Sequence, residues 1–173
     1  MLSKKMEKAL NKQINAEMYS AYLYAAMGAH FDAESLDGLA NWMKAQAQEE
    51  MVHAMKFYSY IVEAGGRVVF EAIDKPPTDF GKPEKVFEQV LKHERKVTKL
   101  INNLVALTRE ENDYATDNFL QWFVAEQVEE EASADDILQK MKLVGDHPHS
   151  LFMMNAKLGE RAPSLAEAAK DDD

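Results

Sequence analysis

The stretch QAQEEMVHAM, from Gln46 to Met55, combines a helical apolar pattern with a cluster of charged side chains. Apolar residues in and around it recur every three to four positions, which predicts a buried helix. The same stretch sets Glu49, Glu50 and His53 close together. Burying two carboxylates and an imidazole in an apolar core costs free energy unless they are paired or bind a metal. The stretch therefore indicates either a solvent-exposed polar patch on a helix or a functional site buried inside a helical protein.

Helical periodicity extends over most of the 173 residues and is interrupted where Gly and Pro gather, between about Gly65 and Pro83. Proline is common at the first helical position, so Pro83 predicts a helix start. Asn112 or Asp113 is the expected N-cap of the helix that follows. The predicted helices cover about residues 3–32, 39–64, 83–111, 114–143 and 150–160, and the segment after about 162 is expected to be frayed.

The connection lengths predict how these helices pack. Short connections after the first and third helices make antiparallel hairpins. The middle connection, about 18 residues, can extend roughly 60 Å, whereas the second helix is roughly 39 Å long. The chain can therefore return along the bundle before the third helix begins. We expect an all-α four-helix bundle of two antiparallel hairpins joined by a long crossover, with a short fifth helix, as a single domain over residues 1–173.

Each of the four long predicted helices carries a carboxylate on its apolar stripe near mid-helix. One acid on such a stripe usually lies at its edge or pairs with a base. Four stripes with an acid at matching depth, and no lysine or arginine on them, would place repelling charges together in a low dielectric. A bound multivalent cation relieves that repulsion, so the pattern predicts a metal site. The residues are Glu17, Glu50, His53, Glu94, Gln127 and Glu130.

The ligand types narrow the choice of metal. The chain has no cysteine, which excludes thiolate zinc sites, iron–sulfur clusters and disulfides. Carboxylates with one imidazole suit iron, manganese or zinc. Di-iron carboxylate bundles use a Glu from each of two helices and Glu-x-x-His from each of the other two. Here Glu50 and His53 form one such motif, whereas Gln127 and Glu130 stand where the second would be.

Charge and hydropathy exclude other classes of partner. The net charge of −10 argues against nucleic acid, whose phosphates need a basic face, and it suits cations. No apolar run is long enough to span a membrane. The N-terminal residues show no apolar segment of a secretory signal, so the expected location is the cytoplasm.

The chain resembles the non-haem ferritins of bacteria and archaea over nearly its whole length. Ferritin-like folds also use two hairpins joined by a long crossover. Four stretches carry the resemblance, and the last is highly specific: NAEMYSAYLY around Glu17 and Tyr24, EEMVHA around Glu50 and His53, KHE ending in Glu94, and FLQWFVAEQVEEE around Gln127 and Glu130.

This resemblance implies a ferroxidase centre that oxidises Fe(II) with dioxygen or peroxide. Its first iron would be held by Glu17, Glu50 and His53. Its second would be held by Glu94 and Glu130, with Glu50 bridging the two ions.

The resemblance also implies further residues beside the di-iron centre. Gln127 would act on the dioxygen side or as a hydrogen-bonding group, and Tyr24 would hydrogen-bond or donate an electron. The alternative for Tyr24 is a plain core tyrosine. A third iron position would be held by Glu49, Glu126 and Glu129, with Glu130 shared. For Glu49 and Glu129 the alternative is a solvated helix face.

The implied function is iron storage and detoxification, with Fe(III) held as a mineral inside a homo-oligomeric cage of about 24 subunits and the fifth helix at a symmetry axis. Two alternatives stay open. A haem-containing bacterioferritin would use a methionine at the place of Met51, but its fourth helix carries a full Glu-x-x-His, so haem is not expected here. A non-storage di-iron oxidase of the same bundle fold would usually show two Glu-x-x-His motifs.

Overall fold

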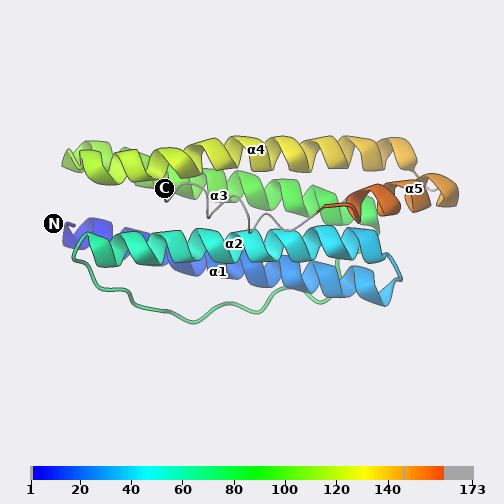
Figure 1. Ribbon diagram of the computed structural model, residues 1–173, viewed down its shortest axis with the longest axis horizontal. Coiled ribbons are helices and arrows are strands. Elements are labelled where there is room, and N and C mark those ends of the chain that lie inside the picture. The colour runs from blue at the N-terminus through cyan, green and yellow to red at the C-terminus, as the bar shows by residue number, and fades with distance from the viewer. Residues whose placement is uncertain (1, 146, 162–173) are drawn as a thin grey trace.

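Helices dominate the part of the chain that the computed structural model describes, residues 2–145 and 147–161. Helices α1–α4 lie side by side as a long bundle, and α5 lies at one end of it (Figure 1). No helix within the described residues is long and apolar enough to cross a membrane. The predicted all-α bundle with a short additional helix is confirmed. Its elements are α1 (Lys4–Ala33), α2 (Asp37–Glu63), α3 (Pro83–Glu111), α4 (Tyr114–Val144) and α5 (Pro148–Leu158).

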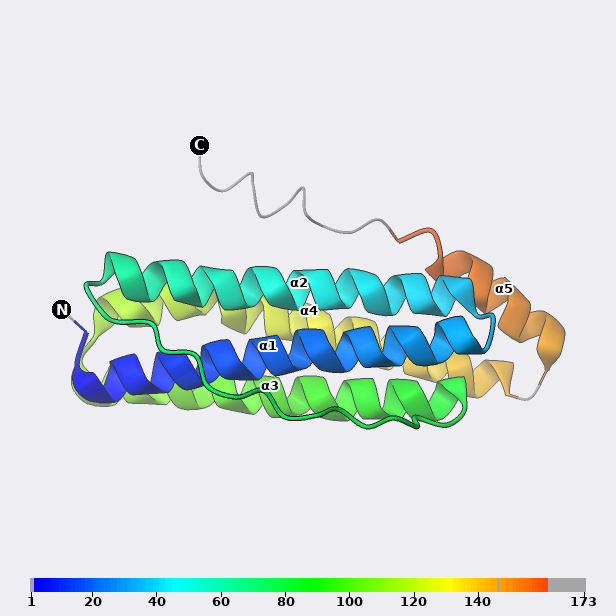
Figure 2. The same cartoon turned by 90° about the horizontal axis from the view of Figure 1, so that it is seen from below.

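Two antiparallel hairpins form the bundle, α1 with α2 and α3 with α4. The crossover, residues 64–82, runs the length of the bundle before α3 begins at the far end (Figure 2). Polar side chains of α1 hold it at both ends. Asn11 donates from Nδ2 to the carbonyl of Arg67 at 3.0 Å, and His30 donates from Nε2 to the carbonyl of Gly81 at 2.9 Å. The crossover therefore follows α1 rather than leaving the bundle surface.

The helix boundaries differ from the prediction by one or two residues. α2 begins at Asp37 rather than at Leu39. α5 begins at Pro148 rather than at residue 150, because this proline takes the first helical position as Pro83 does in α3. The segment after about 162, expected to be frayed, lies outside the described residues.

The turn between α3 and α4 divides its two capping residues between the helices. Asn112 adopts the left-handed conformation, with φ 56°, and ends α3. Asp113 caps α4, because its Oδ1 accepts a hydrogen bond from Thr116 N at 3.1 Å. Of the two expected N-cap candidates, Asp113 is the correct one.

The bundle core consists of two apolar clusters at opposite ends. One includes Phe31 and Trp42, and the other includes Leu10 and Phe57. Between the clusters, all four long helices bury polar side chains, which we call the polar layer. Apolar packing on both sides holds this layer at mid-depth in the bundle. Its members are Glu17, Gln46, Glu50, His53, Glu94 and Gln127.

Candidate metal centre

The polar layer brings together side chains from all four long helices, as the stripe pattern predicts. Its predicted ligands are Glu17 from α1, Glu50 and His53 from α2, Glu94 from α3 and Gln127 from α4, and each is no more than 5% exposed. Charged groups buried this deeply need partners or a bound ion. The question is therefore which of them already have partners in the protein.

Glu17, Glu50 and His53 form a group with the geometry to hold a metal ion. Their ligating atoms all lie within 4.8 Å of one another. Nδ1 of His53 is 3.5 Å from Oε2 of Glu50. Oε2 of Glu17 and Oε2 of Glu50 are both buried without a hydrogen-bond partner. An unsatisfied buried oxygen costs about 1–3 kcal/mol or more, and a cation between the two carboxylates would satisfy both.

Burial and mutual repulsion keep the glutamates protonated to unusually high pH. Burial, followed by the charge of Glu50, raises the pKa of Glu17 to about 8. Burial, followed by the charges of Glu94 and Glu130, raises the pKa of Glu50 well above its ordinary value. Burial and the charge of Glu94 raise the pKa of Glu130 to about 7. The negative charges of Glu50, Glu94 and Glu130 therefore act on one another, and a bound cation would relieve this repulsion.

Neutral side chains orient the carboxylates of α3 and α4. Tyr24 donates a hydrogen bond to Oε1 of Glu94, and Nε2 of Gln127 donates to Oε2 of Glu94 at 3.3 Å. Gln46 donates from Nε2 to Oε2 of Glu130 at 2.9 Å, and Glu130 is partly exposed. Tyr24 is thus more than a packed core tyrosine, because its hydroxyl contacts a candidate ligand.

The residues expected at a third iron position differ in their surroundings. Glu129 is exposed, whereas Glu49 and Glu126 are half-buried. Oε2 of Glu49 accepts a 2.5 Å hydrogen bond from Nη2 of Arg161. The group of ligating atoms within 4.8 Å of one another contains none of these three glutamates. The third position therefore stays a prediction.

Three polar partners of the site were not among the predicted ligands: Gln13, Gln46 and Arg161. Gln13 donates from Nε2 to Oε1 of Glu17 at 2.8 Å. Gln13 and Gln46 each lie one helical turn before a candidate ligand of their own helix, so helical spacing could have identified both. Arg161 gives no such signal, because its partner lies 112 positions away in the chain.

Two other residues near the site are Trp122 and Met51. Trp122 packs edge-on against His53, with ring centroids 5.3 Å apart. This contact limits the orientations of the imidazole ring. Met51, at the place of a haem ligand in bacterioferritin, is 45% exposed on the protomer.

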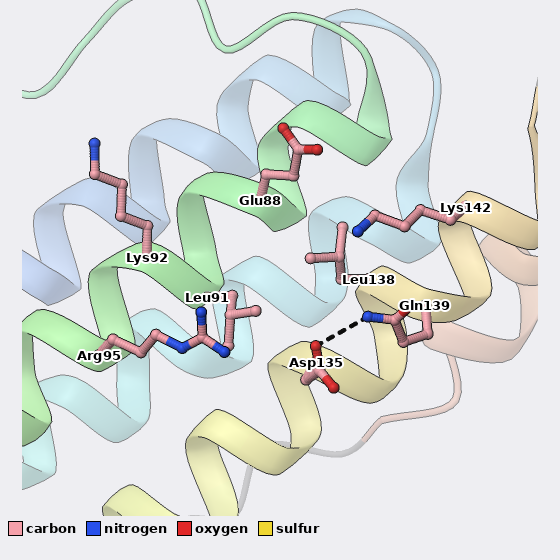
Figure 3. Close-up of a pocket in the computed structure, with 8 residues that line it drawn as sticks. All are labelled: Glu88, Leu91, Lys92, Arg95, Asp135, Leu138, Gln139 and Lys142. Atoms are coloured by element: carbon pink, nitrogen blue, oxygen red, sulfur yellow. Dashed lines mark hydrogen bonds between the residues drawn. The ribbon is translucent and has the colours of Figure 1, made fainter.

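A surface hollow of about 430 Å³ lies between α3 and α4. Figure 3 shows that basic side chains, Lys92, Arg95 and Lys142, line it together with the acidic Glu88 and Asp135. None of the candidate ligands lines this hollow. The candidate metal group is therefore a packed core site that is separate from the hollow.

The chain is similar to known ferritins over most of its length. A family model described as a ferritin-like domain matches residues 7–144. Bacterial non-heme ferritins from Bacteroides fragilis and Staphylococcus aureus are 47% and 40% identical over 161 residues, which cover 93% of this chain and 100% and 97% of the relatives. An engineered closed form of the Archaeoglobus fulgidus ferritin matches with a TM-score of 0.93 at 50% identity, over 94% of this chain and 99% of that chain. The open pore ferritin of the same archaeon gives the same TM-score and identity over 94% of this chain and 100% of its own.

Proposed function

Because the chain belongs to the non-haem ferritin family, we propose that it oxidises Fe(II) in the polar layer and stores the Fe(III) as a mineral inside a multi-subunit cage. Iron is both substrate and cargo in this proposal. The observation that carries it is the group of Glu17, Glu50 and His53. Their ligating atoms lie within 4.8 Å of one another, and two of the carboxylate oxygens are buried without a partner.

The carboxylates have two roles in the proposed oxidation. Glu17, Glu50 and His53 hold the first Fe(II). Glu94 and Glu130 hold the second, with Glu50 between the two ions. The ligands keep the ions close enough to deliver two electrons to one molecule of dioxygen or peroxide. They also favour the product, because the harder and more highly charged Fe(III) gains more from anionic oxygen ligands than Fe(II) does.

Tyr24 and Gln127 act through the α3 carboxylate in this proposal. Both donate hydrogen bonds to Glu94, which fixes the direction of its oxygens. Tyr24 can in addition supply one electron to the dioxygen or peroxide that oxidises the iron. Its hydroxyl proton then passes to the Glu94 oxygen that accepts its hydrogen bond, and the tyrosine is left as a neutral radical. On α4, Gln127 stands at the place of the glutamate and Glu130 at the place of the histidine of a second Glu-x-x-His motif. We propose that the amide of Gln127 acts on the dioxygen side of the pair of ions.

Storage requires a closed shell, and the protomer carries apolar surface that an assembly would cover. Leu143, near the end of α4, and Phe152 of α5 are 86% and 66% exposed. Large exposed apolar side chains mark protein–protein contacts when they gather on one surface. We propose a homo-oligomer of about 24 subunits in the cytoplasm.

Within the cage a third iron position would use Glu49, Glu126, Glu129 and Glu130.

An aerobic Fe(II) titration of the metal-free protein tests storage. The measurement follows ferric absorbance and the amount of iron per chain that stays in solution. Uptake far beyond about three ions per chain is expected. Uptake that stops at about two or three ions would instead favour a non-storage di-iron oxidase of the same fold. A Soret band would favour a haem-containing bacterioferritin, and none is expected.

The double substitution Glu50→Ala, His53→Ala tests the oxidation site. It removes the bridging carboxylate and the imidazole, and we expect the initial rate of Fe(II) oxidation to fall by roughly 10- to 100-fold or more. Glu63→Gln, on an exposed residue at the end of the same helix, is the matched control and should keep the rate. Size-exclusion chromatography confirms that each variant assembles. An assembled double variant that oxidises iron at the normal rate would exclude this site.

A further inference from the structure

α5 lies at the end of the bundle where α2 begins (Figure 2), and Arg161, just beyond α5, reaches a candidate iron ligand. Nη2 of Arg161 donates to Oε2 of Glu49 at 2.5 Å. Asn41 of α2 donates from Nδ2 to the carbonyl of Arg161 at 2.9 Å and to that of Gly159 at 3.3 Å. Backbone and side-chain contacts therefore both hold this arginine against α2.

The guanidinium of Arg161 also lies over an aromatic ring. Its Cζ is 4.8 Å from the ring centroid of Trp42, a distance at which the ring attracts the cation. Nη1 of Arg161 is buried without a hydrogen-bond partner. The side chains of Arg161 and Glu49 are only 26% and 12% exposed, so solvent and salt screen this ion pair less than an open surface pair.

Glu49 belongs electrostatically to the candidate metal centre. Burial is the main cause of the raised pKa values of Glu50 and Glu130, and the charge of Glu49 adds to both. The four helical stripes carry no lysine or arginine to offset this repulsion. Arg161 supplies a positive charge from outside the stripes. Its partner Glu49 is also a predicted ligand of the third iron position, so a metal ion bound there would use the same carboxylate.

We propose that Arg161 occupies the cation position at Glu49 until iron displaces it, so that the third iron position fills only after the di-iron centre. This inference rests on the proposed function, because it needs iron to bind beside Glu49. The guanidinium and a metal ion compete for the same carboxylate oxygen and repel each other. Arg161 is a positioning residue in this scheme. It lowers the affinity of the third position without contacting the first two ions.

Zn(II), which has no redox chemistry, tests the order of binding without iron oxidation. The chain has two tryptophans, so Trp122→Phe leaves Trp42 as the reporter of Arg161. We would titrate this metal-free assembled variant with Zn(II) and follow heat release and Trp42 emission together. We expect Trp42 emission to stay constant while the tightly bound Zn(II) ions fill the di-iron centre. It should change when a more weakly bound Zn(II) ion binds at Glu49 and Arg161 moves away from the Trp42 ring.

Arg161→Gln in the same background removes the competing charge. The weaker ion should then bind roughly fivefold tighter or more, without an emission change, while the tight ions bind as before. Glu160→Gln, on the exposed neighbouring residue, is the matched control and should behave like the parent. Arg161→Lys keeps the charge but lacks the planar guanidinium. It should give an intermediate affinity, which separates the effect of charge from a loss of packing.

Two results would overturn the inference while the proposed function stands. One is an unchanged affinity for the weaker ion in Arg161→Gln when the tight ions bind normally. The other is a Trp42 emission that already changes with the first ions. Loss of all tight Zn(II) binding in the wild-type protein, which keeps Trp122 against His53, would be a different failure, because it would overturn the proposed function together with this inference.

Discussion

Glutamates that stay protonated in the fold make the metal-free protein less stable as the pH rises. Glu17 has a pKa of about 8 and Glu130 of about 7, against an ordinary value of 4.5. Between these limits the unfolded chain has released protons that the folded chain keeps, so the free energy of unfolding falls as the pH increases. We expect the melting temperature of the metal-free protein, measured by scanning calorimetry, to fall from about pH 4.5 to about pH 8.

Glu17→Gln is the control for this pH dependence. The amide cannot ionise, and its carbonyl oxygen can still accept the hydrogen bond that Gln13 donates to Oε1 of Glu17. The melting temperature of this variant should depend less on pH and should equal or exceed that of the wild type at pH 8. At pH 8, Zn(II) should raise the melting temperature of the wild type more than that of Glu17→Gln. The ion binds the ionised carboxylates of the folded state, and the variant lacks one of them. A wild-type melting temperature that rises with pH over this window would contradict the argument.

The burial of the candidate ligands at mid-bundle could be predicted from sequence, whereas the contact of Arg161 could not. Glu17, Glu50 and Glu94 lie on stripes set by helical periodicity, which is a local property of the chain. The pairing of Arg161 with Glu49 depends on how α5 docks on α2, and no local pattern encodes that. The roles in iron chemistry came from the family resemblance rather than from spacing.

α5 packs on the start of α2 so closely that one position in α2 admits only glycine. A Cβ atom at Gly38 would lie 1.8 Å from the backbone oxygen of Asn155. Oδ1 of Asn155 accepts a hydrogen bond from Leu39 N at 3.0 Å, beside the same contact. This docking brings the end of α5 to the region where Arg161 meets Glu49.

Gly38→Ala should therefore displace α5 and destabilise the protein by about 1–3 kcal/mol, the usual cost of overpacking. The control is Gly28→Ala in α1, where the nearest atom to a new Cβ is Cγ of Lys44 at 3.4 Å, an ordinary contact. Alanine is favoured over glycine inside a helix, so this variant should gain up to about 1 kcal/mol. Thermal unfolding of both variants measures the two changes in stability. Equal shifts in the two would show that the α5–α2 contact can yield.

The extents of the helices were predictable because proline, capping residues and apolar spacing act locally. Pro83 and Asp113 mark the starts of α3 and α4 as expected. For the crossover, length alone gave the correct order of the helices. The side chains that hold it on α1, such as Asn11 and His30, read as ordinary surface residues in the sequence.

At the scale of the whole molecule, the polar layer divides one bundle into two apolar ends. Each end is a separate cluster, one including Phe31 and the other Phe57. The layer is complete only when both hairpins associate, because α1 and α2 supply some of the candidate ligands and α3 and α4 supply the others. Association of the hairpins therefore completes the layer, whereas the group of Glu17, Glu50 and His53 comes from the α1–α2 hairpin alone.

Apolar surface left exposed on α5 leads to a prediction about assembly. Phe152 and Met153 are 66% and 56% exposed in the protomer, so we expect subunit contacts to cover them. Phe152→Glu places a charge in such a contact and should shift the protein toward smaller oligomers in size-exclusion chromatography with light scattering. Lys157→Glu adds the same acid to an exposed position of α5 without removing apolar surface and should assemble normally. If Phe152→Glu assembled as fully as Lys157→Glu, the fifth helix would not lie at a subunit interface, and the cage would have to close through other surfaces.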